Sequence, residues 1–132
     1  MMKLIDSKIM SIPGIGDTLG PIILGEIGDA DRFSSAKKLI AFAGLDPVVI
    51  RSGRFENMSG PISKRGSPLL RKALFLAANV ARQNDDNLKR FYDKKISEGK
   101  HHFSALNAVA AKLLRIVYWV LKNNKEYQTQ VN

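Results

Sequence analysis

The chain has 132 residues, 45% of them hydrophobic and 25% charged, which is the size and composition of a single globular domain. Its 21 Lys and Arg against 12 Asp and Glu give a net charge of +9, and this balance favours a polyanionic partner, nucleic acid before membrane. The absence of cysteine excludes disulfides and cysteine-ligated zinc, and every apolar run is far shorter than the ~18 residues of a membrane span.

The positive charge is unevenly distributed along the chain. Residues 1–48 hold five basic and six acidic residues, a net charge of −1, whereas residues 49–75 hold six and one, and residues 76–132 hold ten and five, a net charge of +5 in each. The excess therefore belongs to the middle segment and the C-terminal part. A solvated basic surface without a partner is the alternative to a nucleic-acid-binding surface. In either case we expect a soluble protein of the cytoplasm.

The N-terminal third has the pattern of a helix-hairpin-helix. Apolar residues recur at helical spacing over residues 2–11, which predicts the last turns of a helix. A Pro-Gly-Ile-Gly turn follows, and an apolar helix is predicted to start near Asp17. In this hairpin Gly14 and Gly16 can take positive φ and bring backbone amides close to a phosphate, while Ile15 would fill the space between the helices. The alternative is a tight turn between two packed helices that binds no ligand.

Caps and breakers predict the next elements. A loop over residues 28–32 leads to Ser34 or Ser35, one of which is expected to cap a helix over 36–42. Gly44 is expected to end that helix, because glycine readily adopts the left-handed conformation of a helix end.

Three helices are predicted in the C-terminal half. The first begins with Ser67 as its cap and runs to about residue 83, the second covers about 86–98, and the last spans about 103–123 as the central core helix. The inward positions are expected to be Leu70, Leu74, Ala77 and Val80 or Ala81 in the first, Leu88, Phe91, Tyr92 and Ile96 in the second, and Leu106, Val109, Leu113, Ile116, Val117, Val120 and Leu121 in the third. The predicted fold is mainly α: a helix-hairpin-helix followed by a basic irregular insert and a C-terminal helical bundle.

The insert covers residues 48–66, which interrupt the helical patterns with glycine, proline, serine and positive charge. It opens with a β-branched run at 48–50 that has the pattern of a short strand. Lys64 and Arg65 precede Gly66 and a predicted helix start, and this arrangement is typical of a phosphate-binding site. The spacing of its glycines and lysine does not fit a Walker A loop, so a nucleoside triphosphate site is excluded. The cations expected to contact phosphate in or just after it are Arg51, Arg54, Lys64, Arg65 and Arg71.

Ser52 is the candidate nucleophile of this insert. It lies between Arg51 and Gly53, but a serine hydroxyl attacks poorly unless a base or a metal activates it, and no base is evident in the sequence. From spacing alone, an ordinary turn serine is the simpler interpretation. Ser59, Ser63 and Ser67 are alternatives, although Ser67 is better explained as a helix cap.

The remaining metal-binding residue types form no convincing site. His101 and His102 are adjacent, so in a helix their side chains point about 100° apart and cannot chelate one ion together. Asp29 and Asp31 fall in a loop, and the pair at 85–86 has the pattern of a helix start. We therefore expect no metal in this chain and no complete metal-dependent nuclease.

Several ordered blocks resemble one family of bacterial transposases. These are SIPGIG, LGEIGDADRFSSAKKLIAFAGLDP, RSG and ISKRGSPLLRKALFLAA. In this order and spacing they resemble the C-terminal domain of the Piv/MooV family of DEDD insertion-sequence transposases, the IS116/IS110/IS902 type, which is linked to guide-RNA-directed recombination. The resemblance implies that a serine after the AGL-x-P block attacks DNA to form a phosphoserine intermediate, and the matching residue is Ser52. Val48-Val49-Ile50 before this serine departs from the family's local pattern.

The resemblance also implies an organisation and partners. Residues 1–132 would be a single C-terminal domain, with 1–12 the stub of an upstream coiled-coil helix, 12–47 the helix-hairpin-helix region, 48–66 the basic loop and 67–124 the helices. An N-terminal RuvC-like domain with an acidic quartet would hold Mg²⁺, and DNA, a guide (bridge) RNA and further copies of the protein would be partners in the bacterial nucleoid. Without that domain the isolated chain is expected to be inactive. The alternatives are a non-catalytic helix-hairpin-helix module that binds nucleic acid and a helical assembly domain.

Overall fold

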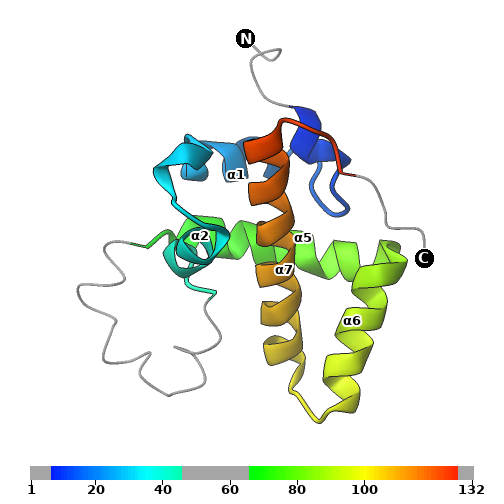
Figure 1. Cartoon of the computed structure of the whole chain (residues 1–132). Coiled ribbons are helices and arrows are strands. Elements are labelled where there is room, and N and C mark those ends of the chain that lie inside the picture. The colour runs from blue at the N-terminus through cyan, green and yellow to red at the C-terminus, as the bar shows by residue number, and fades with distance from the viewer. Residues whose placement is uncertain (1–6, 46–65, 128–132) are drawn as a thin grey trace.

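The computed structural model describes residues 7–45 and 66–127, and these residues form helices joined by short turns (Figure 1). The elements are η2 (Ser7–Ser11), α1 (Leu19–Ile27), η3 (Ala30–Arg32), α2 (Ala36–Phe42), α5 (Pro68–Asn84), α6 (Asp86–Ser97) and α7 (His102–Asn123), where η denotes a 3-10 helix. No strand occurs in these two ranges, so the predicted mainly-α class is confirmed. The strand predicted at 48–50 lies outside the described residues.

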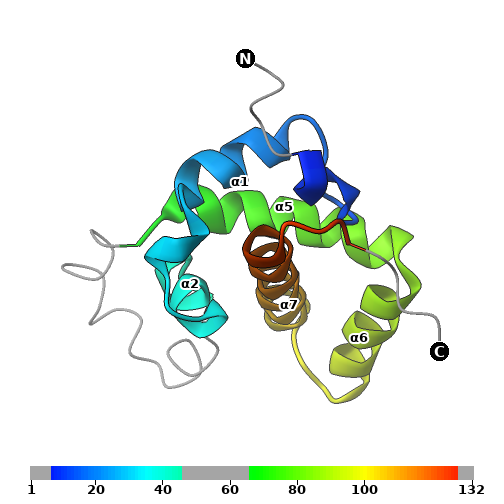
Figure 2. The same cartoon turned by 45° about the horizontal axis from the view of Figure 1, so that its top comes forward.

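Helix α7 is the centre of the fold. Figure 2 shows it crossing α5, with α2 on one side and α6 on the other, and it packs against all three. Its buried face runs the whole length of the helix and follows the predicted stripe closely, although Ile116 and Leu121 are only half-buried. The buried residues of α7 are Ala105, Leu106, Asn107, Val109, Ala110, Leu113, Leu114, Val117 and Val120. By length and composition α7 alone among the described helices could also span a membrane, but here it is the helix on which the core is assembled.

The helix ends follow the predicted capping residues. Ser35 Oγ accepts a hydrogen bond from the Lys38 amide at 3.3 Å, which starts α2, and Gly44 with φ 75° follows its end. Asp85 caps α6 in the same way through the Leu88 amide at 3.0 Å. Gly99 with φ 90° follows the end of α6. Local side-chain chemistry therefore decides where these helices begin and end.

The N-terminal hairpin differs in detail from the expected one. The described part of its first helix, η2, is a 3-10 helix, and 3-10 bonds continue through Ile12 and Ile15, whose amides each donate to a carbonyl three residues earlier at 3.1 Å. Proline at position 13 disfavours a helical conformation at the residue before it, and η2 accordingly ends at Ser11. The expected loop at 28–32 likewise contains η3, capped by the Asp29 carboxylate. Ile15 is buried, as predicted.

The structure decides between two alternative core positions on α5 and exposes one predicted core position on α6. Of the alternatives Val80 and Ala81 on α5, the structure buries Ala81, because the turn at Gly14 covers that side of the helix. Ile96, in the last turn of α6, is also exposed, whereas Leu88 of the same helix is buried. The buried face of α6 is therefore shorter than its hydrophobic pattern suggests.

Candidate nucleic-acid interface

Most of the residues predicted to carry the chemistry lie between the two described ranges of the chain. Ser52 and the four cations Arg51, Arg54, Lys64 and Arg65 all lie within residues 46–65, outside the described residues, as do Ser59 and Ser63. Their roles stay predictions. The structure does describe what holds both ends of this segment, which is called the basic segment below.

Both ends of the basic segment are fixed at the junction of α2 and α5. At its N-terminal end the Leu45 amide donates to the Ile40 carbonyl at 3.0 Å, and the Leu45 carbonyl accepts from Asn107 Nδ2 of α7 at 3.3 Å. At its C-terminal end the Ser67 amide donates to the Phe42 carbonyl at 3.0 Å. Because one hydrogen bond joins the end of α2 to the start of α5, the segment leaves and returns at one place on the scaffold.

Ser67 is a buried helix cap. Its hydroxyl oxygen accepts from the Leu70 amide at 3.1 Å, and its hydroxyl proton is donated to Glu26 Oε1 of α1 at 2.7 Å. Pro68 follows at the first helical position, as predicted. With both roles of the hydroxyl in use inside the protein, Ser67 is a structural residue at the base of the basic segment.

Arg71 lies beside the same junction. It is half-buried in the first turn of α5, and a Cβ built on Gly44 would lie 3.6 Å from its Cδ and 3.7 Å from its Nη1. The guanidinium therefore packs over the residue that ends α2, one residue before Leu45. Of the cations predicted to contact phosphate, Arg71 alone falls within the described ranges.

The hairpin glycines have different environments. Gly14 has the expected positive φ of 86°, but its close approach is to α5, where an added Cβ would meet the Ala77 carbonyl oxygen at 2.2 Å. Gly16 does not adopt positive φ, which corrects that expectation, and nothing lies within 4 Å of an added Cβ. Its carbonyl accepts from the Gly20 amide at 2.8 Å to start α1. Helix packing accounts for the conformation of Gly14, and phosphate binding by this turn stays a prediction.

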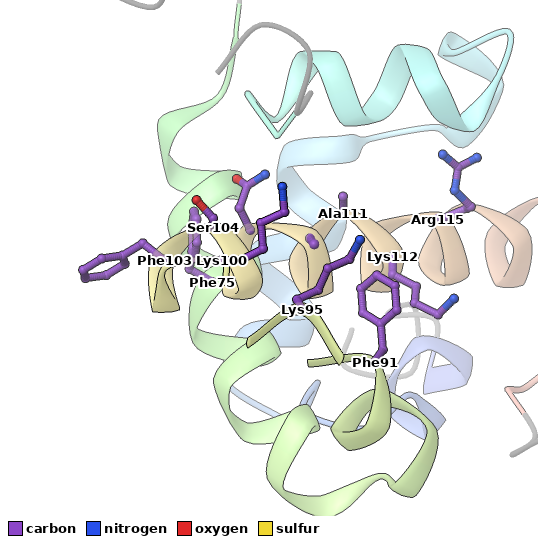
Figure 3. A pocket seen from close by; sticks show the side chains of 11 residues that line it. Phe75, Phe91, Lys95, Lys100, Phe103, Ser104, Ala111, Lys112 and Arg115 are labelled. Carbon is purple, nitrogen blue, oxygen red and sulfur yellow. The ribbon is translucent and has the colours of Figure 1, made fainter. Parts of the chain in front are cut away.

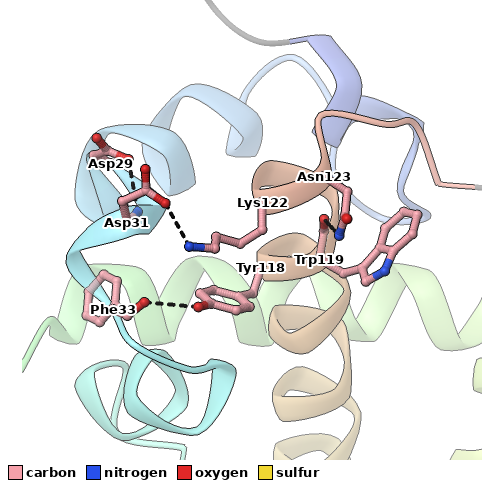
Figure 4. Close-up of polar contacts among 7 residues, drawn as sticks. All are labelled: Asp29, Asp31, Phe33, Tyr118, Trp119, Lys122 and Asn123. Carbon is pink, nitrogen blue, oxygen red and sulfur yellow. Dashed lines mark hydrogen bonds and ion pairs between the residues drawn. The ribbon is translucent and has the colours of Figure 1, made fainter.

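Asp31 and the two histidines make structural contacts in the described part of the chain. Asp31 Oδ1 accepts from Lys122 Nζ at 2.7 Å, joining η3 to the end of α7 (Figure 4), and this hydrogen bond raises the pKa of Lys122 above the usual lysine value. Nearby, the Tyr118 hydroxyl donates to the Phe33 carbonyl at 2.9 Å. His101 is the cap of α7, and His102 is its first residue and contacts the Tyr92 hydroxyl.

A groove of about 720 Å³ lies along α7 and is bounded by α5 and α6 (Figure 3). The sequence did not predict it. Four cations and three phenylalanines line it, with no carboxylate among the lining residues: Lys95, Lys100, Lys112 and Arg115, and Phe75, Phe91 and Phe103. Lys112 and Arg115 are three residues apart, so their spacing alone predicts that both lie on one face of the helix. That this face meets α6 and α5 depends on tertiary packing and could not be read from spacing.

Comparison with known proteins places these observations in a family. The model of the transposase IS116/IS110/IS902 family matches residues 6–93. An uncharacterised 42 kDa protein of insertion element IS900 from Mycobacterium paratuberculosis is 36% identical over 121 residues, covering 90% of this chain and 30% of the relative. The pilin gene-inverting protein of Moraxella bovis is 33% identical over 127 residues, covering 96% and 39%. The transposase for IS1111A of Coxiella burnetii is 31% identical over 124 residues, covering 92% and 34%. The chain thus spans about a third of the length of these relatives.

Proposed function

The chain belongs to the transposase IS116/IS110/IS902 family, and we propose that it is the serine-bearing C-terminal domain of an enzyme that cleaves and exchanges DNA strands. Relatives named as transposases and as a pilin gene-inverting protein support a role in DNA rearrangement. Because the chain spans about a third of their length, the proposal assigns the rest of the active site to an N-terminal RuvC-like domain.

In this proposal the Ser52 oxygen attacks a DNA phosphate, its bond to phosphorus replaces the bond to the sugar oxygen of the adjacent nucleotide, and that oxygen leaves as a free hydroxyl while the other strand end stays linked to Ser52. Arg51, Arg54, Lys64 and Arg65 would hold the negative phosphate oxygens, and Arg71 would support them at the base of the basic segment. Cations placed around a phosphate stabilise the charge that develops on its oxygens during attack. The serine still needs its proton removed, which is why a second domain is required.

The observation that carries the proposal is the fixing of both ends of the basic segment. The Phe42–Ser67 and Asn107–Leu45 hydrogen bonds attach it to α2, α5 and α7, three of the helices that contribute to the core. A segment displayed on a rigid scaffold can position a reacting group far better than a free tail. This supports a site at the segment over a simple basic surface.

A metal site does not form within the described residues. Across residues 7–45 and 66–127, no three His, Asp or Glu side chains gather closely enough to hold a metal ion. We therefore propose that the Mg²⁺ implied by the family resemblance is held by the RuvC-like domain. A guide RNA, assembly into oligomers and a cytoplasmic, nucleoid-associated location are further parts of the proposal.

Ser52→Ala in the enzyme that contains both domains tests the proposal. Strand exchange should be lost while DNA affinity changes less than about threefold, because a small uncharged side chain contributes little to phosphate binding. Ser59→Ala and Ser63→Ala are the matched controls and should retain activity. Unchanged strand exchange in Ser52→Ala would instead support a helix-hairpin-helix module that only binds nucleic acid. Absence of DNA binding by the wild-type protein would support an assembly domain.

A further inference from the structure

The groove along α7 combines cations with exposed aromatic surface, and no part of the proposed chemistry uses it. We propose that this groove binds a short stretch of single-stranded nucleic acid, with its cations on the backbone phosphates and Phe103 stacked on an unpaired base. The inference rests on the proposed function and deepens it, because it gives the unpaired strands of a recombination reaction a place on this domain.

The charge of the groove fits a polyanion. Among the described residues, the side chains of Lys100 and Arg115 make no hydrogen bond or ion pair. Lys112 Nζ lies 4.9 Å from the centre of the Phe91 ring, and Lys95 Nζ lies 5.3 Å from it and 4.0 Å from a Glu98 carboxylate oxygen. Lys95 is therefore ion-paired with Glu98, whereas Lys100, Lys112 and Arg115 have no carboxylate partner among the described residues. Positive side chains without neutralising partners are what a phosphate backbone requires.

The exposed aromatic group identifies the strand as unpaired. Phe103 has 66% of its surface exposed at one end of the groove, and its ring stacks on His101 with centroids 5.7 Å apart and planes 14° apart. A ring face of this kind can accept a base only when that base is not already stacked and paired in a duplex. An acidic peptide would match the charge, but it would leave the Phe103 face uncovered.

The dimensions fit a few nucleotides. Along α7 the groove extends from Phe103 to Arg115 (Figure 3), about 18 Å at the rise of an α-helix. At a stacked spacing of about 3.4 Å per nucleotide this length accommodates about five nucleotides. Binding to the isolated chain is therefore expected to be weak and salt-dependent.

The groove also adjoins the basic segment. Asn107 lines it, and the same side chain donates to the carbonyl of Leu45, the last described residue before the segment. A strand lying in the groove would therefore pass close to the point where the segment leaves the scaffold. This continuity favours a substrate or guide strand over a ligand unrelated to the reaction.

Binding of short labelled strands to the 132-residue chain tests the inference. The probes are oligothymidylate, oligouridylate, an abasic strand of the same length and duplex DNA, with circular dichroism to check that each variant folds. Phe103→Ala should weaken oligothymidylate binding by about tenfold and leave the abasic strand unaffected, since only stacking is lost. Trp119→Ala, which removes another half-exposed aromatic side chain of α7 outside the groove, is the matched control and should bind like the wild type.

The cations are tested through salt dependence. The double variant Lys112→Gln/Arg115→Gln should reduce the salt slope for a single strand by about 0.7 for each cation removed. Lys112→Gln should weaken binding more than Lys125→Gln, which removes the same charge beyond the end of α7. Tighter binding of oligouridylate would identify a guide RNA as the occupant, and tighter binding of oligothymidylate a DNA strand.

The inference would be overturned if every groove variant bound oligothymidylate and oligouridylate as tightly as the wild-type chain does. If duplex binding persisted in that case, the proposed function would stand without the groove, whereas no binding to any probe would contradict both. Normal strand affinity with a loss of self-association in sedimentation would show that the groove contacts another copy of the chain, and would equally overturn the inference.

Discussion

Gly14 and Gly16 lie two residues apart in one turn, yet a side chain at each would meet a different environment. The turn at Gly14 presses against the backbone of α5, whereas Gly16 faces open space. The sequence pattern predicted a turn between two helices here, and the structure has one between η2 and α1, but the pattern treated the two glycines alike. The distinction depends on which face of the turn meets α5, and this is a property of the assembled fold.

Substituting these glycines gives a matched pair of stability measurements. Gly14→Ala should destabilise the fold by about 2–5 kcal/mol, because it combines a positive φ with a collision at the Ala77 carbonyl. Gly16→Ala should stay within about 0.5 kcal/mol of the wild type. Urea unfolding followed by circular dichroism measures both. Equal effects of the two substitutions would mean that the hairpin is not packed against α5 as described.

Ser67 offers a second residue-scale prediction. Its hydroxyl caps α5 and also donates to Glu26, so Ser67→Ala should cost about 1–2 kcal/mol of stability. Ser35→Ala removes a longer and more exposed cap bond of 3.3 Å and should cost less, about 0.5–1 kcal/mol. A reversed order in denaturant unfolding would contradict the assignment of Ser67 as the anchor of the basic segment.

At the scale of elements, the sequence predicted most of what the structure contains. The starts of α2, α5 and α6 follow from serine and aspartate caps, and the core position of α7 follows from its apolar stripe. The tightening of η2 to a 3-10 helix was missed, as was η3, because very short helices carry little hydrophobic periodicity. The groove was missed because its lining comes from three helices whose mutual packing is not encoded in any one of them.

The central role of α7 leads to a further stability prediction. Leu113 is fully buried near the middle of this helix, so Leu113→Ala should destabilise the fold by about 2–5 kcal/mol through lost burial and a residual cavity. Leu76→Ala on α5 is the matched control, because that side chain is 52% exposed, and it should cost well under 1 kcal/mol. A change below about 0.5 kcal/mol for Leu113→Ala in urea unfolding would place the core elsewhere.

At the scale of the whole molecule, the net charge of +9 attracts the DNA that the proposed function requires. About five phosphate contacts from the basic segment should make log K for duplex DNA fall with log salt at a slope of about −4 to −5. Replacing Arg51 and Arg54 by Gln should make the slope shallower by about 1.8. Fluorescence anisotropy at several salt concentrations measures this, and a flat response would remove the polyanion hypothesis.

The identity of the nucleophile is the central claim, and peptide mapping of a trapped covalent adduct tests it most directly. The 132-residue chain alone, even with Mg²⁺, should form no adduct, since a serine hydroxyl without a base or a metal stays protonated near neutral pH. Joined to its RuvC-like domain, the same chain should yield a DNA-linked peptide whose modified residue is Ser52. An adduct mapped to Ser59 or Ser63, or strand cleavage by the isolated chain, would contradict the assignment.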